Sequence, residues 1–323
     1  MSMQFCQWDK QALVSGLPYF SFDQHRALTE QEREYCYFYN LDFFRTLPGV
    51  EQKIGYFDCL GFQIVMQYFC PANPKGTVLV LHGYFDHVGL YHHLIRFLLQ
   101  SNYAVVCYDL PGHGLSSGDV AGIKSFAHYQ SVLSQCLNLI KNKVPGPLFA
   151  IGQSTGAAVL IDYYLSLRHS KENGAFRQVI LLAPLVRPVG WKTAVVTHTL
   201  VEPFFSTWKR VQRNNSSDNR FIRFLKHIDP LQSKTLSVDW VGSLKRWIPR
   251  VESAHPVAMD VTIIQGDSDG TVDWRHNLVV LHRKFSQLHV HYIPGAEHHL
   301  VNESEAIRSQ MFRVIHQALL REE

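Results

Sequence analysis

The chain has 323 residues, of which 46% are apolar and 18% charged, and its formal net charge is +4. These values fit one large globular domain, or one core with an insertion, and exclude a disordered or fibrous protein. No apolar run approaches the roughly 20 residues that a transmembrane helix needs, and residues 1–20 lack the basic start and continuous apolar stretch of a secretory signal peptide.

The cysteines show neither a C-x-x-C pair nor zinc-finger spacing. Unpaired thiols suit a reducing compartment, so we expect a cytoplasmic protein. The eighteen histidines lack Asp, Glu or Cys partners at ligand spacing. We therefore expect neither a metal site nor a cofactor. The cysteines are Cys6, Cys36, Cys59, Cys70, Cys107 and Cys136.

Residues 1–50 are expected to form a partly helical N-terminal extension that packs along the outside of the core. Thr29 and Glu32 have the spacing of a capping box. The helix that they start is predicted to run to about Phe44, before Pro48-Gly49 breaks it.

Short apolar runs alternate with amphipathic stretches along the rest of the chain. This alternation predicts a mostly parallel sheet of about eight strands with helices on both faces. The predicted strands are 52–58, 62–70, 77–81, 103–108, 148–151, 179–182, 261–264 and 289–293. The predicted helices are 90–99, 124–142, 155–168, 274–285 and 303–320.

Residues 185–250 interrupt the alternation and read as a helical insertion between two parts of the core, 51–184 and 251–323. Residues 192–250 hold eleven Lys or Arg and four Asp or Glu, a net charge of +7. Apolar residues at helical spacing in this segment fit two interpretations that can hold together: they pack onto the core, and part of them lines an acyl-chain pocket or contacts a lipid surface. The positive charge favours anionic lipid surfaces or acidic substrates, and no motif accompanies it that would indicate nucleic-acid binding.

Gly152-Gln153-Ser154-Thr155-Gly156 matches the G-x-S-x-G pattern of a nucleophilic serine. An apolar strand ends at Ile151 and a helix-forming stretch begins after Ser154. A turn this tight needs glycine on both sides of the serine, because the backbones pass closely. We therefore predict that Ser154 is a nucleophile at the N-terminus of the following helix.

A serine that attacks an ester or amide carbonyl needs backbone N–H groups to stabilise the oxyanion, each lowering the barrier by roughly 3–4 kcal/mol. One donor is expected from Thr155, which follows the nucleophile. The other is expected from the loop after the strand that ends at Leu81, where Gly83 allows a close approach and Tyr84 supplies the N–H group. His82 in this loop is expected to be structural.

The proton of the serine hydroxyl must pass to a histidine. In α/β-hydrolases the nucleophile, the acid and the histidine follow one another in that order, with the histidine after the last strand. The loop after residue 293 holds His298, which we predict as the base, and His299, which remains the alternative.

Three carboxylates compete for the acid position in the loop after strand 261–264. Asp273 is placed to cap the next helix, and Asp267 directly follows Gly266 at the strand end. Asp269 lies in the middle of the loop and is the predicted acid, which orients the imidazole and stabilises its charged form.

These residues together resemble the monoglyceride lipase and lysophospholipase-like branch of the α/β-hydrolases, a group also classed with serine aminopeptidases. The resemblance runs from about Phe57 to the C-terminus. Further pieces that carry it are Leu81-His82-Gly83, Asp86-His87, Tyr91, the run from Asp109 to Ser116, Asp229-Pro230-Leu231, the loop from Gln265 to Val272, and Gly295-Ala296 with His298. Departures are Thr155 where the family often has Met, Asp86 where it has Glu, Ser131 and Val132 in place of acidic residues, and the extension before residue 50.

The resemblance implies an α/β-hydrolase fold in which Ser154, Asp269 and His298 form a catalytic triad, Tyr84 and Thr155 form the oxyanion hole, and residues 185–250 form a lid. We expect hydrolysis of carboxylic esters, such as monoacylglycerol or a lysophospholipid, and peripheral contact of the basic segment with an anionic membrane at its inner face. An amidase or aminopeptidase using the same three residues is an alternative. A non-catalytic ligand-binding protein of this fold is another.

Overall fold

The computed structural model describes residues 8–167, 174–210 and 214–321. Its centre is a single sheet of eight strands in the order β1-β2-β4-β3-β5-β6-β9-β10. None of the helices described in these ranges is long and apolar enough to pass through a bilayer. The strands are β1 Glu51–Cys59, β2 Phe62–Cys70, β3 Thr77–Leu81, β4 Ala104–Tyr108, β5 Leu148–Gln153, β6 Gln178–Leu182, β9 Val257–Gly266 and β10 Phe285–Ile293.

The sheet is mostly parallel, as predicted. β2 pairs antiparallel with both β1 and β4, whereas every pair from β4 through β10 is parallel. β3, β4 and β6 are buried at every residue, and apart from Thr77 and Gln178 at the starts of β3 and β6 their buried residues are apolar or aromatic. This is the composition of a strand that is covered by helices on both faces.

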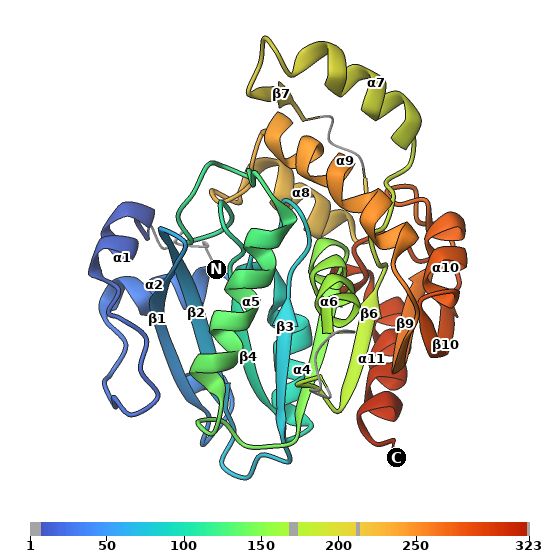
Figure 1. The fold of residues 1–323 in the computed structure, drawn as a ribbon. Coiled ribbons are helices and arrows are strands. Elements are labelled where there is room, and N and C mark those ends of the chain that lie inside the picture. The colour runs from blue at the N-terminus through green and yellow to red at the C-terminus, as the bar shows by residue number, and fades with distance from the viewer. Residues whose placement is uncertain (1–7, 168–173, 211–213, 322–323) are drawn as a thin grey trace.

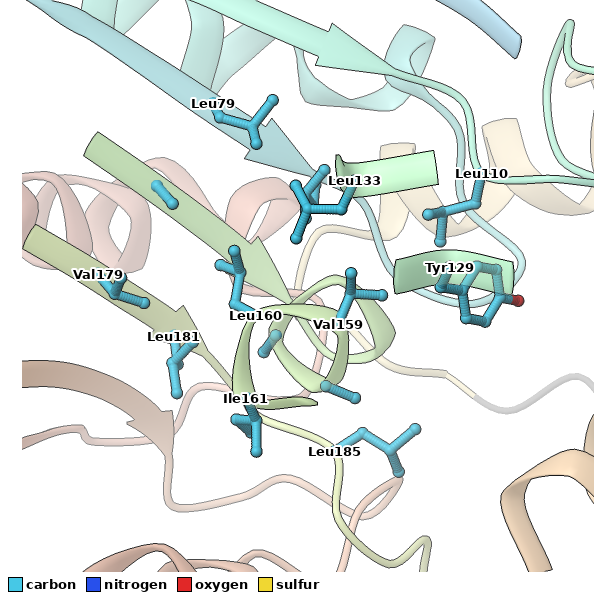
Figure 2. Close-up of a cluster of buried hydrophobic side chains, with 14 of the residues drawn as sticks. Leu79, Leu110, Tyr129, Leu133, Val159, Leu160, Ile161, Val179, Leu181 and Leu185 are labelled. Carbon is cyan, nitrogen blue, oxygen red and sulfur yellow. The ribbon is translucent and has the colours of Figure 1, made fainter. Parts of the chain in front are cut away.

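Helices cover both faces of the sheet (Figure 1). α5, Phe126–Ile140, and α6, Thr155–Ser166, lie on one face, and α4, His92–Gln100, and α11, Glu305–Leu319, lie on the other. Figure 2 shows part of the hydrophobic core on the face that α5 and α6 cover. There Leu133 of α5 and Leu160 of α6 belong to one buried cluster with Leu79 and Leu181 of the sheet. This is the α/β-hydrolase fold that the sequence predicted.

The N-terminal extension packs on the same face as α4 and α11. Its helices are α1 Lys10–Gly16, α2 Glu30–Phe38 and α3 Phe43–Thr46. The Thr29 and Glu32 capping box is present as predicted. The prediction of one helix to Phe44 was wrong, because the chain turns at Asn40, whose φ of 56° is left-handed and ends the helix. The extension is also more deeply packed than expected, since Tyr35 and Phe43 are fully buried.

The segment between β6 and β9 lies beyond one end of the sheet (Figure 1). It contains more than the predicted helices, because a two-stranded antiparallel ribbon joins them. α9 runs past the expected boundary at residue 250. The elements are α7 Trp191–Val201, β7 Thr207–Lys209, α8 Asn219–His227, β8 Thr235–Ser237 and α9 Val238–Ser253.

Several predicted boundaries shift by a few residues. A short 3-10 helix, Val88–Tyr91, precedes α4, and another, Leu300–Asn302, precedes α11. α10, Trp274–His282, ends before Phe285, which was predicted to be helical and instead begins β10. The predicted end of the helix at residue 168 lies outside the described residues. Boundaries are poorly encoded in local sequence because tertiary contacts override weak propensities.

Candidate active site

Ser154 occupies the sharp turn between β5 and α6, with φ of 52° and ψ of −107°. The flanking glycines are required by close backbone contact. A Cβ added at Gly152 would lie 2.6 Å from Ala157 N, and one at Gly156 would lie 2.3 Å from Leu81 O. The turn therefore holds the serine in a strained conformation at the N-terminus of a helix, whose dipole favours negative charge at that point.

The structure brings the three predicted catalytic side chains together. His298 Nε2 lies 3.0 Å from Ser154 Oγ, and His298 Nδ1 lies 2.7 Å from Asp269 Oδ2. Asp269 Oδ1 also accepts hydrogen bonds from the N–H groups of Thr271 and Val272 at 2.8 and 3.2 Å. All three side chains are buried. This arrangement can pass a proton from the hydroxyl to the imidazole while the carboxylate fixes the ring.

The competing residues have other partners. His299 points away from Ser154, and its Nε2 lies 3.0 Å from Asp86 Oδ1. Asp267 accepts a hydrogen bond from Gly295 N at 2.8 Å. Asp273 caps α10 as predicted, accepting from His276 N at 3.3 Å.

The electrostatics of the site favour a charged pair of His298 and Asp269. Burial by itself lowers the pKa of His298, but the charge and hydrogen bond of Asp269 outweigh it, so the pKa is raised. Burial raises the pKa of Asp269, but His298 and the two backbone N–H groups outweigh that effect, so the pKa is lowered. A carboxylate that stays ionised beside an imidazole makes the imidazole a stronger base.

Tyr84 and Thr155, the predicted oxyanion-hole residues, line the same cavity as Ser154. Thr155 is the first residue of α6, so its N–H group has no acceptor within the helix. The loop that carries Tyr84 can lie close to Ser154 because residue 83 is glycine. A Cβ added at Gly83 would lie 3.3 Å from Ser154 Cβ and 2.8 Å from Asp86 Oδ2. Among the described residues, neither N–H group has a hydrogen-bond acceptor. Both are thus free to bind an oxyanion.

The Tyr84 side chain ties this loop to the segment between β6 and β9. Its ring stacks on Trp240 of α9 at a centroid distance of 3.7 Å. Its hydroxyl donates to Ala121 O at 2.7 Å and accepts from Ser237 N at 3.3 Å. His82 supports the same loop. Its Nδ1 lies 2.8 Å from Gly83 O, and its Nε2 accepts a hydrogen bond from Leu110 N at 2.8 Å. Burial lowers the pKa of His82 to about 3, which suits a neutral structural residue.

Two buried polar clusters behind the site were not predicted. In the first, Tyr91 OH donates to Asp86 Oδ2 and accepts from Gly83 N, both at 3.0 Å, while His299 binds the other Asp86 oxygen. In the second, Asp229 binds Tyr39 OH at 2.7 Å and His87 Nε2 at 3.0 Å. The resemblance had marked Asp86, His87, Tyr91 and Asp229, but no local pattern marks Tyr39.

A cavity of about 290 Å³ lies over Ser154 and His298, between the core and the segment joining β6 to β9. Most of its lining is apolar or aromatic, and Arg210 is its one charged residue apart from histidine among the described lining residues. No group of three or more His, Cys, Asp or Glu side chains in the described part of the chain is arranged to hold a metal ion. The apolar lining residues are Phe85, Leu185, Pro188, Val189, Trp191, Ala194, Leu236, Trp240, Val241, Leu244 and Val272.

Known proteins resemble this chain over most of its length. Human monoglyceride lipase is 27% identical over 266 residues, covering 79% of this chain and 86% of its own. The monoacylglycerol lipase of Mycolicibacterium smegmatis is 23% identical over 263 residues, covering 76% and 89%. A solved soluble variant of monoglyceride lipase from Saccharomyces cerevisiae, in complex with a substrate analogue, superposes with a TM-score of 0.70 at 19% identity, covering 84% of this chain and 94% of that one.

A family model gives the assignment. The model described as Hydrolase_4, serine aminopeptidase, S33, matches residues 72–305. The match begins just before β3 and includes the turn at Ser154, the segment between β6 and β9, and the loops that carry Asp269 and His298. This chain therefore belongs to the Hydrolase_4 family of α/β-hydrolases.

Proposed function

We propose that this protein is a serine esterase that hydrolyses monoacyl lipids, with Ser154 as nucleophile, His298 as general base and acid, and Asp269 as the residue that orients His298. The observation that carries the proposal is the pair of hydrogen bonds that link Asp269 to His298 at 2.7 Å and His298 to Ser154 at 3.0 Å. Ser154 and His298 line a mostly apolar cavity.

The mechanism follows from this geometry. Ser154 Oγ attacks the ester carbonyl while His298 Nε2 takes the hydroxyl proton, and the N–H groups of Tyr84 and Thr155 stabilise the oxyanion. The C–O bond to the alcohol breaks as His298 donates the proton to the departing oxygen. Water then attacks the acyl-enzyme, with His298 again taking a proton, and the fatty acid leaves as Ser154 regains its hydrogen.

The cavity lining supports an ester over an N-terminal peptide as substrate. An aminopeptidase needs a carboxylate to bind the ammonium group of its substrate. Among the described lining residues none is Asp or Glu, and Arg210 would repel an ammonium group. The apolar lining also suits an acyl chain, whose burial stabilises binding by about 0.8 kcal/mol per methylene.

We further propose that residues 185–250 act as a lid that contacts anionic membranes. Support comes from exposed apolar side chains around the end of α7, of which Leu200 is 69% and Phe204 78% exposed. The net charge of +7 in residues 192–250 would draw this surface toward anionic lipid.

Labelling with a fluorophosphonate probe tests the proposed chemistry, because an activated serine attacks the phosphorus and displaces fluoride, which leaves the probe covalently attached. We expect labelling of the wild type and none of Ser154→Ala. Hydrolysis of p-nitrophenyl esters of rising chain length, with monoacylglycerol and lysophosphatidylcholine beside them, tests the substrate class. Equal labelling of Ser154→Ala would overturn the assignment of the nucleophile, and hydrolysis restricted to short esters would overturn the lipid substrate.

A further inference from the structure

Arg210 is a partly buried cation in the wall of the cavity that holds Ser154 and His298. Its guanidinium lies 3.8 Å from the centre of the Phe85 ring, and Phe85 directly follows Tyr84 in the loop beside the serine. Nη1 donates to Gln232 Oε1 at 2.8 Å and to Ser233 O at 3.2 Å. The guanidinium is therefore held in place in the wall of the cavity that Ser154 and His298 also line.

The surrounding structure positions this side chain firmly. Arg210 directly follows β7, and its N–H group donates to Lys234 O at 3.2 Å, which extends the β7–β8 ribbon by one residue. Gln232, which holds the guanidinium, also donates from Nε2 to Phe85 O at 2.9 Å. A single amide side chain thus joins Arg210 to the loop that carries Tyr84.

No carboxylate among the described residues forms an ion pair with Arg210. Asp86 is the acidic residue whose charge acts on it, and Asp86 is already paired with His299 at 3.0 Å. Burial lowers the pKa of Arg210, which reflects the cost of holding a cation out of water. Buried charges in proteins are normally paired with an opposite charge. Arg210 has no such partner among the described residues, and an anionic ligand can supply one.

We propose that Arg210 binds a phosphate group on the alcohol part of the substrate, so that the protein prefers monoacyl glycerophosphates over neutral monoacylglycerol. This inference rests on the proposed esterase function. The alcohol part of a monoacyl lipid carries either hydroxyl groups, which need no cation, or a phosphate. Arginine binds phosphate well because its planar guanidinium can donate two parallel hydrogen bonds to two phosphate oxygens. Nη2 and Nε are available for this, since no protein acceptor binds them among the described residues.

Asn215 supplies a second polar group in the same cavity wall. The backbone carbonyl oxygen of Asn215 accepts a hydrogen bond from the backbone N–H group of His299 at 2.7 Å, which fixes the Asn215 backbone beside the His298 loop. The cavity lining thus combines the polar residues Arg210 and Asn215 with apolar residues such as Leu244 and Val272. A substrate in which an ester joins an anionic head to an acyl chain offers a partner to both kinds of residue.

The test compares 1-oleoyl lysophosphatidate with 1-oleoylglycerol below their critical micelle concentrations. We expect the wild type to hydrolyse the phosphate-bearing lipid with the higher kcat/KM. In Arg210→Gln the ratio of the two kcat/KM values should fall about 10- to 150-fold, the range for losing a hydrogen bond to a charged group. In Arg210→Lys, which keeps the positive charge but lacks the planar guanidinium, the ratio should fall by a smaller factor than in Arg210→Gln.

Arg220→Gln is the matched control, because Arg220 is an exposed arginine of the same segment and should leave the ratio unchanged. A wild-type preference for oleoylglycerol, or an Arg210→Gln ratio equal to that of the wild type, would overturn this inference while leaving the esterase proposal intact. Failure of the wild type to hydrolyse any ester, p-nitrophenyl butyrate included, would overturn both.

Discussion

Tyr39 in the N-terminal extension donates a 2.7 Å hydrogen bond to Asp229, 190 residues later in the chain. The other oxygen of Asp229 binds His87 Nε2 at 3.0 Å, and His87 belongs to the loop that carries Tyr84. One carboxylate therefore connects the extension, the segment between β6 and β9, and the loop beside Ser154. The extension is in this way part of the support of the candidate active site.

Tyr39→Phe tests this connection. The change removes the hydroxyl but keeps the ring, and leaves a buried carboxylate with one hydrogen bond fewer. We expect the free energy of unfolding to fall by about 1.5–3 kcal/mol, measured by urea denaturation. Tyr37→Phe is the control, because Tyr37 is 37% exposed and its hydroxyl has no hydrogen-bond partner among the described residues. Equal effects of the two changes would contradict the argument.

Gly156→Ala tests the requirement for close approach at the turn. The added methyl group would lie 2.3 Å from Leu81 O, and a backbone oxygen cannot move aside without shifting β3. We expect a loss of about 3 kcal/mol or more in unfolding free energy together with loss of ester hydrolysis, measured by thermal unfolding and by p-nitrophenyl butyrate turnover.

The control for that change is Gly16→Ala, because nothing lies within 4 Å of a Cβ at Gly16. This variant should match the wild type or exceed it in stability by about 0.4–1 kcal/mol. If Gly156→Ala were as stable as Gly16→Ala, the close contact at Leu81 would not constrain the turn.

Asp269→Asn should shift the pH dependence of activity. The base must be neutral to accept a proton, so activity falls as the pH drops through the pKa of His298. Asp269 raises that pKa through its charge and its hydrogen bond; without it, burial, which lowers the pKa, is opposed by the charge of Asp86 alone among the causes that act on His298. We expect the acid limb of kcat/KM to move to lower pH, and kcat to fall by about 10⁴-fold. A pH–rate profile with p-nitrophenyl butyrate measures both effects.

Asp267→Asn provides the comparison for this experiment. Asp267 lies two residues earlier, is exposed, and binds Gly295 N instead of an imidazole. Its replacement should leave the acid limb in place. A limb that moves equally in both variants, or in neither, would refute the pairing of Asp269 with His298 in the working enzyme.

Phe204→Asp tests contact of the lid with membranes. Phe204 is 78% exposed, and burying an aromatic ring of this kind in lipid contributes about 1.5–3 kcal/mol. We expect the wild type to sediment with phosphatidylserine-containing vesicles, less so at high salt, and the variant to bind about 10- to 100-fold more weakly. Val120→Asp, at a 62% exposed position outside the segment, should bind like the wild type.

The short-range features of the fold could be predicted because they depend on neighbours in the chain. The strands were predictable from continuous apolar runs, and the turn at Ser154 from two glycines flanking a serine between a strand and a helix. The capping of α10 by Asp273 is likewise a local hydrogen bond. The prediction of the helix end failed at Asn40, where a left-handed backbone conformation turns the chain. Residue type predicts such a conformation only weakly, because asparagine adopts it in a minority of cases.

His298 and His299 show why the site itself was harder to predict. The two are adjacent and chemically identical, yet one ring reaches Ser154 and the other Asp86. Only the backbone direction of the loop decides between them. A preference for His298 could be drawn from chain order, but the partner of His299 could not.

The sequence by itself determined the class of fold, the turn at Ser154 and the order in which the candidate catalytic residues follow one another, because apolar periodicity and glycine spacing act over a few residues. The tertiary structure alone decided that Tyr39 reaches Asp229, that Tyr84 stacks on Trp240 and that Arg210 lies over Phe85. These contacts join distant segments, and their partners are selected by how whole elements pack against the sheet. No pattern of neighbouring residues carries that information.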